Sequence, residues 1–235
     1  MKYLLLRLYG PMCSWGDIAV GEIRPSFIHP TKSAVLGLVA GALGIRRDEE
    51  EKHRQFTETF GFAVLIETAG MPLSDYHTAQ VPSGDAIYCT RRNELAEDGY
   101  NLNTILSTRD YRVDAIYTVA LWEYQKSEWD LNNIAKALIQ PVFVPYLGRK
   151  SCPVALPFEP QVVEAVSIKE AIGRSQFLDY KQLGINPSNQ RMLFWDEYGE
   201  AGVAHQHIFE RRDMTLSRER WQFDVRRERH TAWTE

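Results

Sequence analysis

The sequence has few cysteines and no apolar run long enough to span a membrane. Only three cysteines occur among 235 residues, and none forms a C-x-x-C pair. This excludes a disulfide framework and favours a reducing compartment. The longest strongly apolar run, 34–43, is too short for a bilayer and is interrupted by two glycines. We therefore expect a cytoplasmic protein that makes no use of a membrane.

The loop before Lys32 lacks the glycines of a nucleotide-hydrolysing P-loop. That loop requires G-x-x-x-x-G-K-[ST], because the glycines let backbone amides wrap the phosphates. Here Ile-His-Pro-Thr precedes Lys32. What remains is a helix predicted over 32–43, with Thr31 as its N-cap. Lys32 and Ser33 could hold one phosphate at the start of this helix. The alternative is a capped helix with a solvated lysine.

An overall basic charge is also missing, since the formal net charge is −4. The distribution of charge is nevertheless uneven. Residues 23–47 and 131–158 contain no acid, and both contain lysine and arginine, including Arg24 in the first stretch. Seven arginines lie within 211–229. Segregation of this kind can build a basic face on an acidic protein, which is compatible with nucleic-acid binding.

Apolar periodicity predicts strands over 2–9, 61–68 and 111–122 and helices over 32–43, 48–60 and 127–141. Ser127 and Asp130 form a capping arrangement for the last helix. Residues 69–112 are too polar and too long for a plain connection, which favours a projecting hairpin. The order strand, helix, strand, insertion, strand, helix is that of an α+β, ferredoxin-like domain.

Two groups of residues in the insertion have a composition suited to RNA. Tyr76 and His77 stand in "SDYHTA", where His77 could be a general base or an RNA contact. Arg109, Tyr111 and Arg112 interleave basic and aromatic side chains in "STRDYRV", which suits backbone contact together with base stacking. Both groups could also be ordinary exposed surface.

The stretch "VPYLGRKSCP" predicts a tight turn between Pro145 and Gly148. The turn would present Tyr146, Arg149 and Lys150 together, and such a group can hold a phosphate and a base. A purely structural turn is the alternative. His205 and His207 have no third residue at metal-ligand spacing. We therefore predict neither a metal site nor a cofactor.

Five segments in unchanged order resemble the CasD family, the crRNA 5′-handle-binding RAMP subunit of the type I-E CRISPR complex Cascade. They are "LLLRLYGPMCSWG", "RPSFIHPTKSAVLGLVAGALGI", "DYHT", "YTVALW" and "PYLGRKSCP". The resemblance implies a ferredoxin-like (RRM-like, RAMP) domain over residues 1–157, with a thumb-like hairpin inserted at about 73–112. It also implies a smaller C-terminal β region over 158–235.

The resemblance implies a non-catalytic subunit that caps the 5′ handle of the CRISPR RNA in antiviral defence. Its implied partners are the CRISPR RNA, the CasC backbone subunit and the CasA large subunit, with target DNA reached only through the complex. Trp15, within the first matching segment, joins the residues taken as RNA-binding. Those residues are Trp15, Arg24, Lys32, Ser33, Tyr76, His77, Arg109, Tyr111, Arg112, Tyr146, Arg149 and Lys150.

One enzymatic alternative stays open, because related type I-C subunits cleave repeat RNA. It is a metal-independent endoribonuclease that uses His77 with Tyr76 or with a lysine such as Lys32. Metal-free cleavage needs a base near the 2′-hydroxyl and a cation for the developing charge. The sequence contains candidates for both roles and does not fix their geometry.

Overall fold

A computed structural model describes residues 1–82, 87–96, 102–179, 182, 184–185, 190–220 and 222–234. The helices are α1 (Lys32–Ala42), α2 (Glu50–Thr59), α3 (Arg91–Ala96), α4 (Leu131–Ile139) and α5 (Ile168–Gly173). The strands are β1 (Lys2–Tyr9), β2 (Met12–Cys13), β3 (Trp15–Gly16), β4 (Ile23–Arg24), β5 (Ser26–Phe27), β6 (Phe60–Thr68), β7 (Met71–Pro82), β8 (Leu102–Val113), β9 (Ile116–Glu123), β10 (Gln161–Glu164), β11 (Met192–Asp196), β12 (His207–Ser217) and β13 (Gln222–Ala232).

The body of the protein is a seven-stranded antiparallel sheet in the order β10-β1-β9-β6-β11-β13-β12. Apolar residues of β1 alternate between its two faces, as the period of a strand requires. Leu4, Leu6 and Leu8 belong to a core shared with α1, α2 and α4. Tyr3 and Leu5 belong to a second core shared with α5. The protein is therefore mixed α/β, with helices on both faces of the sheet.

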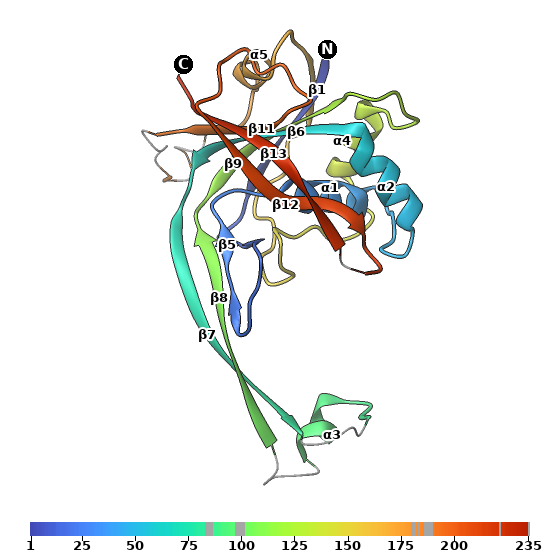
Figure 1. Cartoon of the computed structure of the whole chain (residues 1–235), viewed down its shortest axis with the longest axis vertical. Helices are drawn as coiled ribbons and strands as arrows, with labels where there is room; N and C mark the ends of the chain where they lie inside the picture. Colours follow the sequence, from blue (N-terminus) through green and yellow to red (C-terminus); the bar gives the residue numbers. More distant parts are fainter. Residues whose placement is uncertain are drawn as a thin grey trace.

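Strands β7 and β8 form a long antiparallel ribbon that extends away from this body (Figure 1). The sequence-based expectation of a projecting hairpin agrees with this ribbon, although residues 83–86 and 97–101 lie outside the described residues. The two-domain division at residue 157 stays a prediction. Strands from both sides of that boundary share the seven-stranded sheet.

Two predicted elements differ from the structure. The strand expected over 111–122 is broken between β8 and β9, because Asp114 has φ 55 and turns the chain. The last predicted helix begins at Leu131, where the Asp130 side chain accepts a hydrogen bond from the Asn132 N–H. Ser127 does not cap that helix, since its N–H and hydroxyl both donate to the Glu123 carboxylate.

Candidate nucleic-acid interface

The start of α1 carries the predicted cap, but Lys32 is not available to a phosphate. Thr31 Oγ1 accepts a hydrogen bond from the Ala34 N–H at 3.2 Å, as the sequence indicates. Lys32 is 4% exposed, and its Nζ donates to Asp196 Oδ2 at 3.0 Å. The Lys32 N–H donates to Asp213 Oδ2 at 2.8 Å. The N–H and the ammonium of Lys32, which were predicted to bind a phosphate, thus already donate to carboxylates. The prediction of Lys32 as an RNA contact is therefore wrong.

Burial controls the ionisation of this ion pair. It lowers the pKa of Lys32 and raises that of Asp196, while the attraction between the two groups acts in the opposite direction on each. Asp196 also accepts hydrogen bonds from the backbone N–H groups of Phe62 and Tyr198. The pair therefore connects α1 to the end of β11 inside the protein, which is a structural role.

Two other predicted residues have structural partners. Trp15 is buried, and its ring packs edge-on against Tyr117 with centroids 5.7 Å apart. RNA cannot reach it, so Trp15 also leaves the interface. Arg112 is half-buried and donates to the carbonyl oxygens of Ala69 and Gly70, at the start of the ribbon. Its guanidinium therefore stabilises the turn before β7.

Four predicted residues do meet at the base of the ribbon. Arg24 on β4 is paired in parallel register with Arg109 on β8, so the two side chains lie on the same face of the sheet. Tyr111 is two residues beyond Arg109 in β8 and therefore lies on that face as well. The Arg149 guanidinium lies 4.9 Å from the centroid of the Tyr111 ring. Arg149 also donates to the Arg24 carbonyl oxygen at 3.2 Å. This ribbon-base face is basic, as the composition indicated. Tyr111 is 6% exposed and belongs to the core, so it supports Arg149 from beneath and is not available to stack on a base.

The residues of the enzymatic alternative are not brought together. His77 pairs with Ser107 and Tyr76 with Thr108, so the two side chains lie on opposite faces of the ribbon. His77 Nε2 lies 3.4 Å from Asp75 Oδ2. Lys32 is paired with Asp196 in the interior. A general base and a neighbouring cation are thus not assembled from these three residues.

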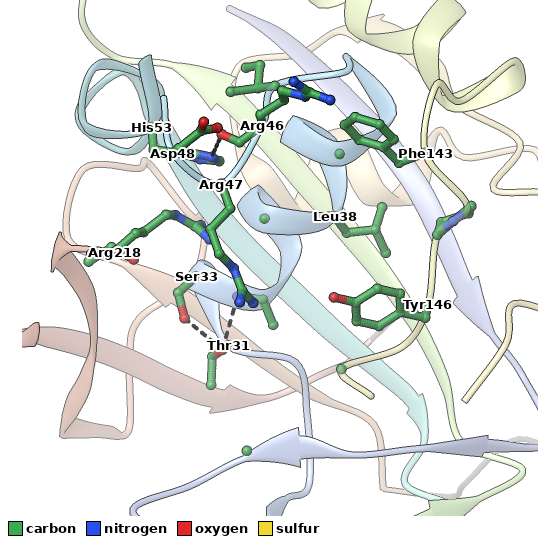
Figure 2. Close-up of a pocket in the computed structure, with 18 of the residues that line it drawn as sticks. Thr31, Ser33, Leu38, Arg46, Arg47, Asp48, His53, Phe143, Tyr146 and Arg218 are labelled. Carbon is green, nitrogen blue, oxygen red and sulfur yellow. Dashed lines mark hydrogen bonds between the residues drawn. The ribbon is translucent and has the colours of Figure 1, made fainter. Parts of the chain in front are cut away.

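A crevice of about 770 Å³ runs along α1 (Figure 2). Its floor is the small-residue face of the helix, and its walls come from the loop after α1, the loop after α4 and the hairpin β12–β13. It is lined by Gly16, Thr31, Ser33, Ala34, Gly37, Leu38, Gly41, Ile45, Arg46, Arg47, Asp48, His53, Phe143, Val144, Pro145, Tyr146, Gly148, Thr215, Arg218 and Phe223.

The glycines of α1 keep the floor of the crevice open. A Cβ placed on Gly41 would meet no described atom within 4 Å, and one on Gly37 would lie 3.4 Å from Arg218 Nη2. Tyr146 faces this floor from the opposite wall (Figure 2). A flexible backbone can therefore approach α1 closely between an aromatic wall and an arginine wall.

The crevice has more positive than negative charge. Arg47 extends over α1 toward Ser33 and lies between Arg218 and Tyr146 (Figure 2). Burial, and then the charge of Arg47, lower the pKa of Arg218, while Tyr146 and Glu50 act in the opposite direction. Arg218 Nε is buried and has no hydrogen-bond partner among the described residues. An anion placed here would relieve the repulsion between the two arginines.

His53 adds a neutral group to the same crevice. Its Nε2 lies 3.0 Å from the carbonyl oxygen of Arg46. Burial, and then the charge of Arg218, lower the pKa of His53. The positive charge of the crevice therefore comes from its arginines.

The predicted turn at 145–150 exists, but its residues face two different sites. Gly148 has φ 84, and a Cβ there would fall 1.8 Å from the Ser14 carbonyl oxygen, so the position requires glycine. Tyr146 lines the crevice, while Arg149 lies on Tyr111 at the ribbon base. Lys150 is exposed at the turn. The turn thus lies between the crevice and the ribbon-base face.

Sequence reasoning placed Ser33 and Tyr146 at an interface but did not single out Arg46, Arg47 or Arg218. The available signal was their location in one acid-free and one arginine-rich stretch. No motif connects these stretches, because Arg47 and Arg218 lie far apart in the sequence.

The residues that the structure describes support neither a metal site nor a membrane-spanning helix. Among them, no group of three or more His, Cys, Asp or Glu side chains is arranged to hold a metal ion. None of the helices in the described ranges is long and apolar enough to cross a membrane.

Known proteins resemble the chain over nearly its whole length. Residues 3–229 match a family described as CRISPR-associated protein (Cas_Cas5). The chain is 32% identical over 230 residues to "CRISPR system Cascade subunit CasD" of Escherichia coli (strain K12), covering 93% of this chain and 92% of that protein.

Two solved structures share the fold. One, a "CRISPR RNA-guided surveillance complex", has a TM-score of 0.67 and 23% identity and covers 98% of this chain and 89% of its own. The other, "Crystal structure of Cas protein", has a TM-score of 0.61 and 22% identity and covers 98% and 94%. The sequence resemblance to the CasD family is confirmed, and this chain belongs to the Cas5 family of CRISPR-associated proteins.

Proposed function

We propose that this protein is a non-catalytic RNA-binding subunit of a type I-E CRISPR surveillance complex and caps the 5′ handle of the CRISPR RNA. The observation that carries the proposal is the crevice on α1, where Arg47 and Arg218 converge above an open floor. Phosphate contacts supply most of the affinity of such interfaces, and aromatic walls accept unstacked bases. The 32% identity to the Cascade subunit CasD supports the same role.

The fold proposal is a ferredoxin-like, RAMP-type domain with a thumb-like hairpin. Strands β10, β1, β9 and β6 are adjacent in the sheet in that order. Along the chain, α1 lies between β1 and β6, and α4 lies between β9 and β10. That arrangement supports a βαββαβ unit. The ribbon β7–β8 would be the thumb. Because β10 completes the βαββαβ unit, the smaller C-terminal β region would begin after Glu164, later than the boundary predicted at residue 157.

The partners we propose are the CRISPR RNA, the CasC backbone subunit and the CasA large subunit. Target DNA would be reached only through the assembled complex, in the cytoplasm. The ribbon-base face, whose cations are Arg24, Arg109 and Arg149, adjoins the turn at 145–150 and would continue the RNA path beyond the crevice.

Binding is favoured over RNA cleavage because the candidate catalytic side chains are apart. Tyr76 and His77 lie on opposite faces of the ribbon, and Lys32 is buried against Asp196. Metal-free cleavage requires a base and a cation at one scissile bond. This supports a subunit that holds RNA and leaves cleavage to another protein.

The test is the affinity of the full chain for RNA with the handle sequence, measured by fluorescence anisotropy against a scrambled RNA of equal length. We expect tighter binding of the handle. The same protein is then incubated with the full repeat RNA in EDTA, and we expect no specific cut. Equal affinity for both RNAs would contradict the handle assignment, and a single specific cut would establish the nuclease.

A further inference from the structure

A second cavity of about 1080 Å³ adjoins the crevice at the start of α1. It lies between the β3–β5 pair and the hairpin β12–β13. The two cavities have four lining residues in common: Gly16, Thr31, Ser33 and Phe223. A Cβ placed on Gly16 would meet no described atom within 4 Å, so no side chain closes the passage at that residue. A flexible chain could thus occupy both cavities at once.

The second cavity is aromatic where the crevice is cationic. Phe27, Phe194 and Phe209 all line it. The Arg211 guanidinium lies 3.7 Å from the centroid of the Phe27 ring and holds that ring in place. Phe209 is 47% exposed and Val225 is 48% exposed. Large apolar side chains left open in a concave site are typical of a ligand pocket.

One wall of this second cavity, called the aromatic cavity below, is formed by His230, whose ring nitrogens lack hydrogen-bond partners in the described part of the chain. Both ring nitrogens of His230 are buried and have no hydrogen-bond partner among the described residues. Burial, and then the charges of His207 and His29, lower the pKa of His230, so its ring is neutral. A neutral imidazole has one donor and one acceptor to satisfy. The edge of a nucleobase has both, whereas an aliphatic side chain has neither.

We propose that the aromatic cavity receives one unstacked base of a single-stranded RNA whose phosphate backbone lies in the crevice. The inference rests on the proposed RNA-binding function and adds a base-binding site to it. A nucleotide has a charged phosphate and an aromatic base. The cationic crevice suits the phosphate, and the adjoining aromatic cavity suits the base. Ser33, which lines both, marks the point where the backbone passes from one to the other.

An apolar side chain from a partner protein is the competing occupant. Two observations favour the base. The cavity opens into an arginine-lined crevice at Gly16 and Ser33, and its His230 wall calls for a polar ligand. A stacked base interacts with the π-face of Phe209, so its binding requires an aromatic residue there. A partner's aliphatic side chain would accept any apolar residue of similar size.

The experiment uses the full chain and a set of handle RNAs, each with 2-aminopurine at one position. This base loses fluorescence when an aromatic ring stacks on it. We expect quenching at one position that Phe209→Leu abolishes and Phe209→Trp retains. Phe209→Leu should weaken handle binding about tenfold, the loss expected from one stacked base. An RNA that lacks the base at that position should bind wild type and Phe209→Leu equally.

Ile208→Ala is the matched control, because Ile208 is 49% exposed, neighbours Phe209 in β12 and does not line the cavity. It should leave both signals unchanged. Handle binding that is unaffected by Phe209→Leu, with no protein-dependent quenching at any position, would overturn the base site alone. Loss of complex assembly with Phe209→Ala but not with Phe209→Leu, at normal RNA affinity, would assign the cavity to a partner protein instead. A wild-type chain that binds no handle RNA would overturn the proposed function as well.

Discussion

Arginines of the C-terminal hairpin occur in two contrasting environments. Arg226 is buried and donates to both Asp213 oxygens and to Glu228, and Arg211 donates to Glu228 at 2.7 Å. Arg218, at the far end of β12, lies near Arg47 and has an unpartnered Nε among the described residues. Burial raises the cost of an unpaired charge. Arg226 has two carboxylate partners, which indicates a structural role, although its Nη1 has no hydrogen-bond partner within the described ranges. Arg218 has no carboxylate partner among the described residues, which indicates a site for an anion.

The buried group also explains how the hairpin is attached to the body. Asp213 accepts from Arg226 and, through Oδ2, from the Lys32 N–H at the start of α1. Burial alone would raise the pKa of Glu228, but His29, Arg226 and Arg211 surround the carboxylate and lower it. The hairpin is thus hydrogen-bonded to the start of α1 through Asp213, and it contributes Arg218 to the crevice at its turn.

The largest effect should come from breaking the buried group. Arg226→Met leaves the carboxylates of Asp213 and Glu228 in the interior with a partner removed, which should lower the free energy of unfolding by about 3–5 kcal/mol. Urea denaturation measures this change. Arg54→Met is the control, because Arg54 pairs with Glu51 and Glu58 on the exposed side of α2, where solvent screens the pairs, so this substitution should lower the free energy of unfolding far less. Equal losses in the two variants would remove the distinction between the environments.

Lys32→Met should have a smaller effect on stability and none on phosphate contact. Asp196 keeps its backbone hydrogen bonds from Phe62 and Tyr198, and its raised pKa lets it take up a proton, so we expect a loss of about 2 kcal/mol. The salt dependence of handle binding should stay at the wild-type value. Unchanged stability with a weaker salt dependence would restore Lys32 as a phosphate contact.

The smallest stability change is expected at the ribbon base. Arg149→Ala combined with Lys150→Ala removes a cation–π contact to Tyr111 and an exposed charge, so the free energy of unfolding should fall by about 1 kcal/mol or less. RNA affinity should fall for all sequences alike, because we propose that these two cations contact the RNA backbone. A loss of several kcal/mol at normal RNA affinity would show that the turn is only structural.

Local signals in the sequence predicted the local structure well. The apolar strand 2–9 is β1, and Thr31 caps α1. The break at Asp114 was missed because apolar residues stand on both sides of it, although aspartate is one of the residues that adopt a positive φ more often than others.

The sequence predicted which residue types make up the candidate site, but not which individual residues. Lys32 was predicted to contact a phosphate because its actual partner, Asp196, lies 164 residues away and no local pattern connects the two. Arg47 and Arg218 become neighbours only when the hairpin β12–β13 completes the sheet beside β11. Basic and aromatic stretches therefore indicated RNA binding, while long-range pairing decided which cations were already used by the fold.

The salt dependence of handle binding tests the contrast between the two arginine environments most directly. For single-stranded RNA, the slope of log K against log salt is about −0.7 for each phosphate contact. The double variant Arg47→Gln, Arg218→Gln should therefore reduce the magnitude of the slope by about 1.4, with Arg54→Gln equal to wild type. A double variant that is folded, as judged by urea denaturation, and retains the wild-type slope would contradict the assignment of the crevice to the RNA backbone.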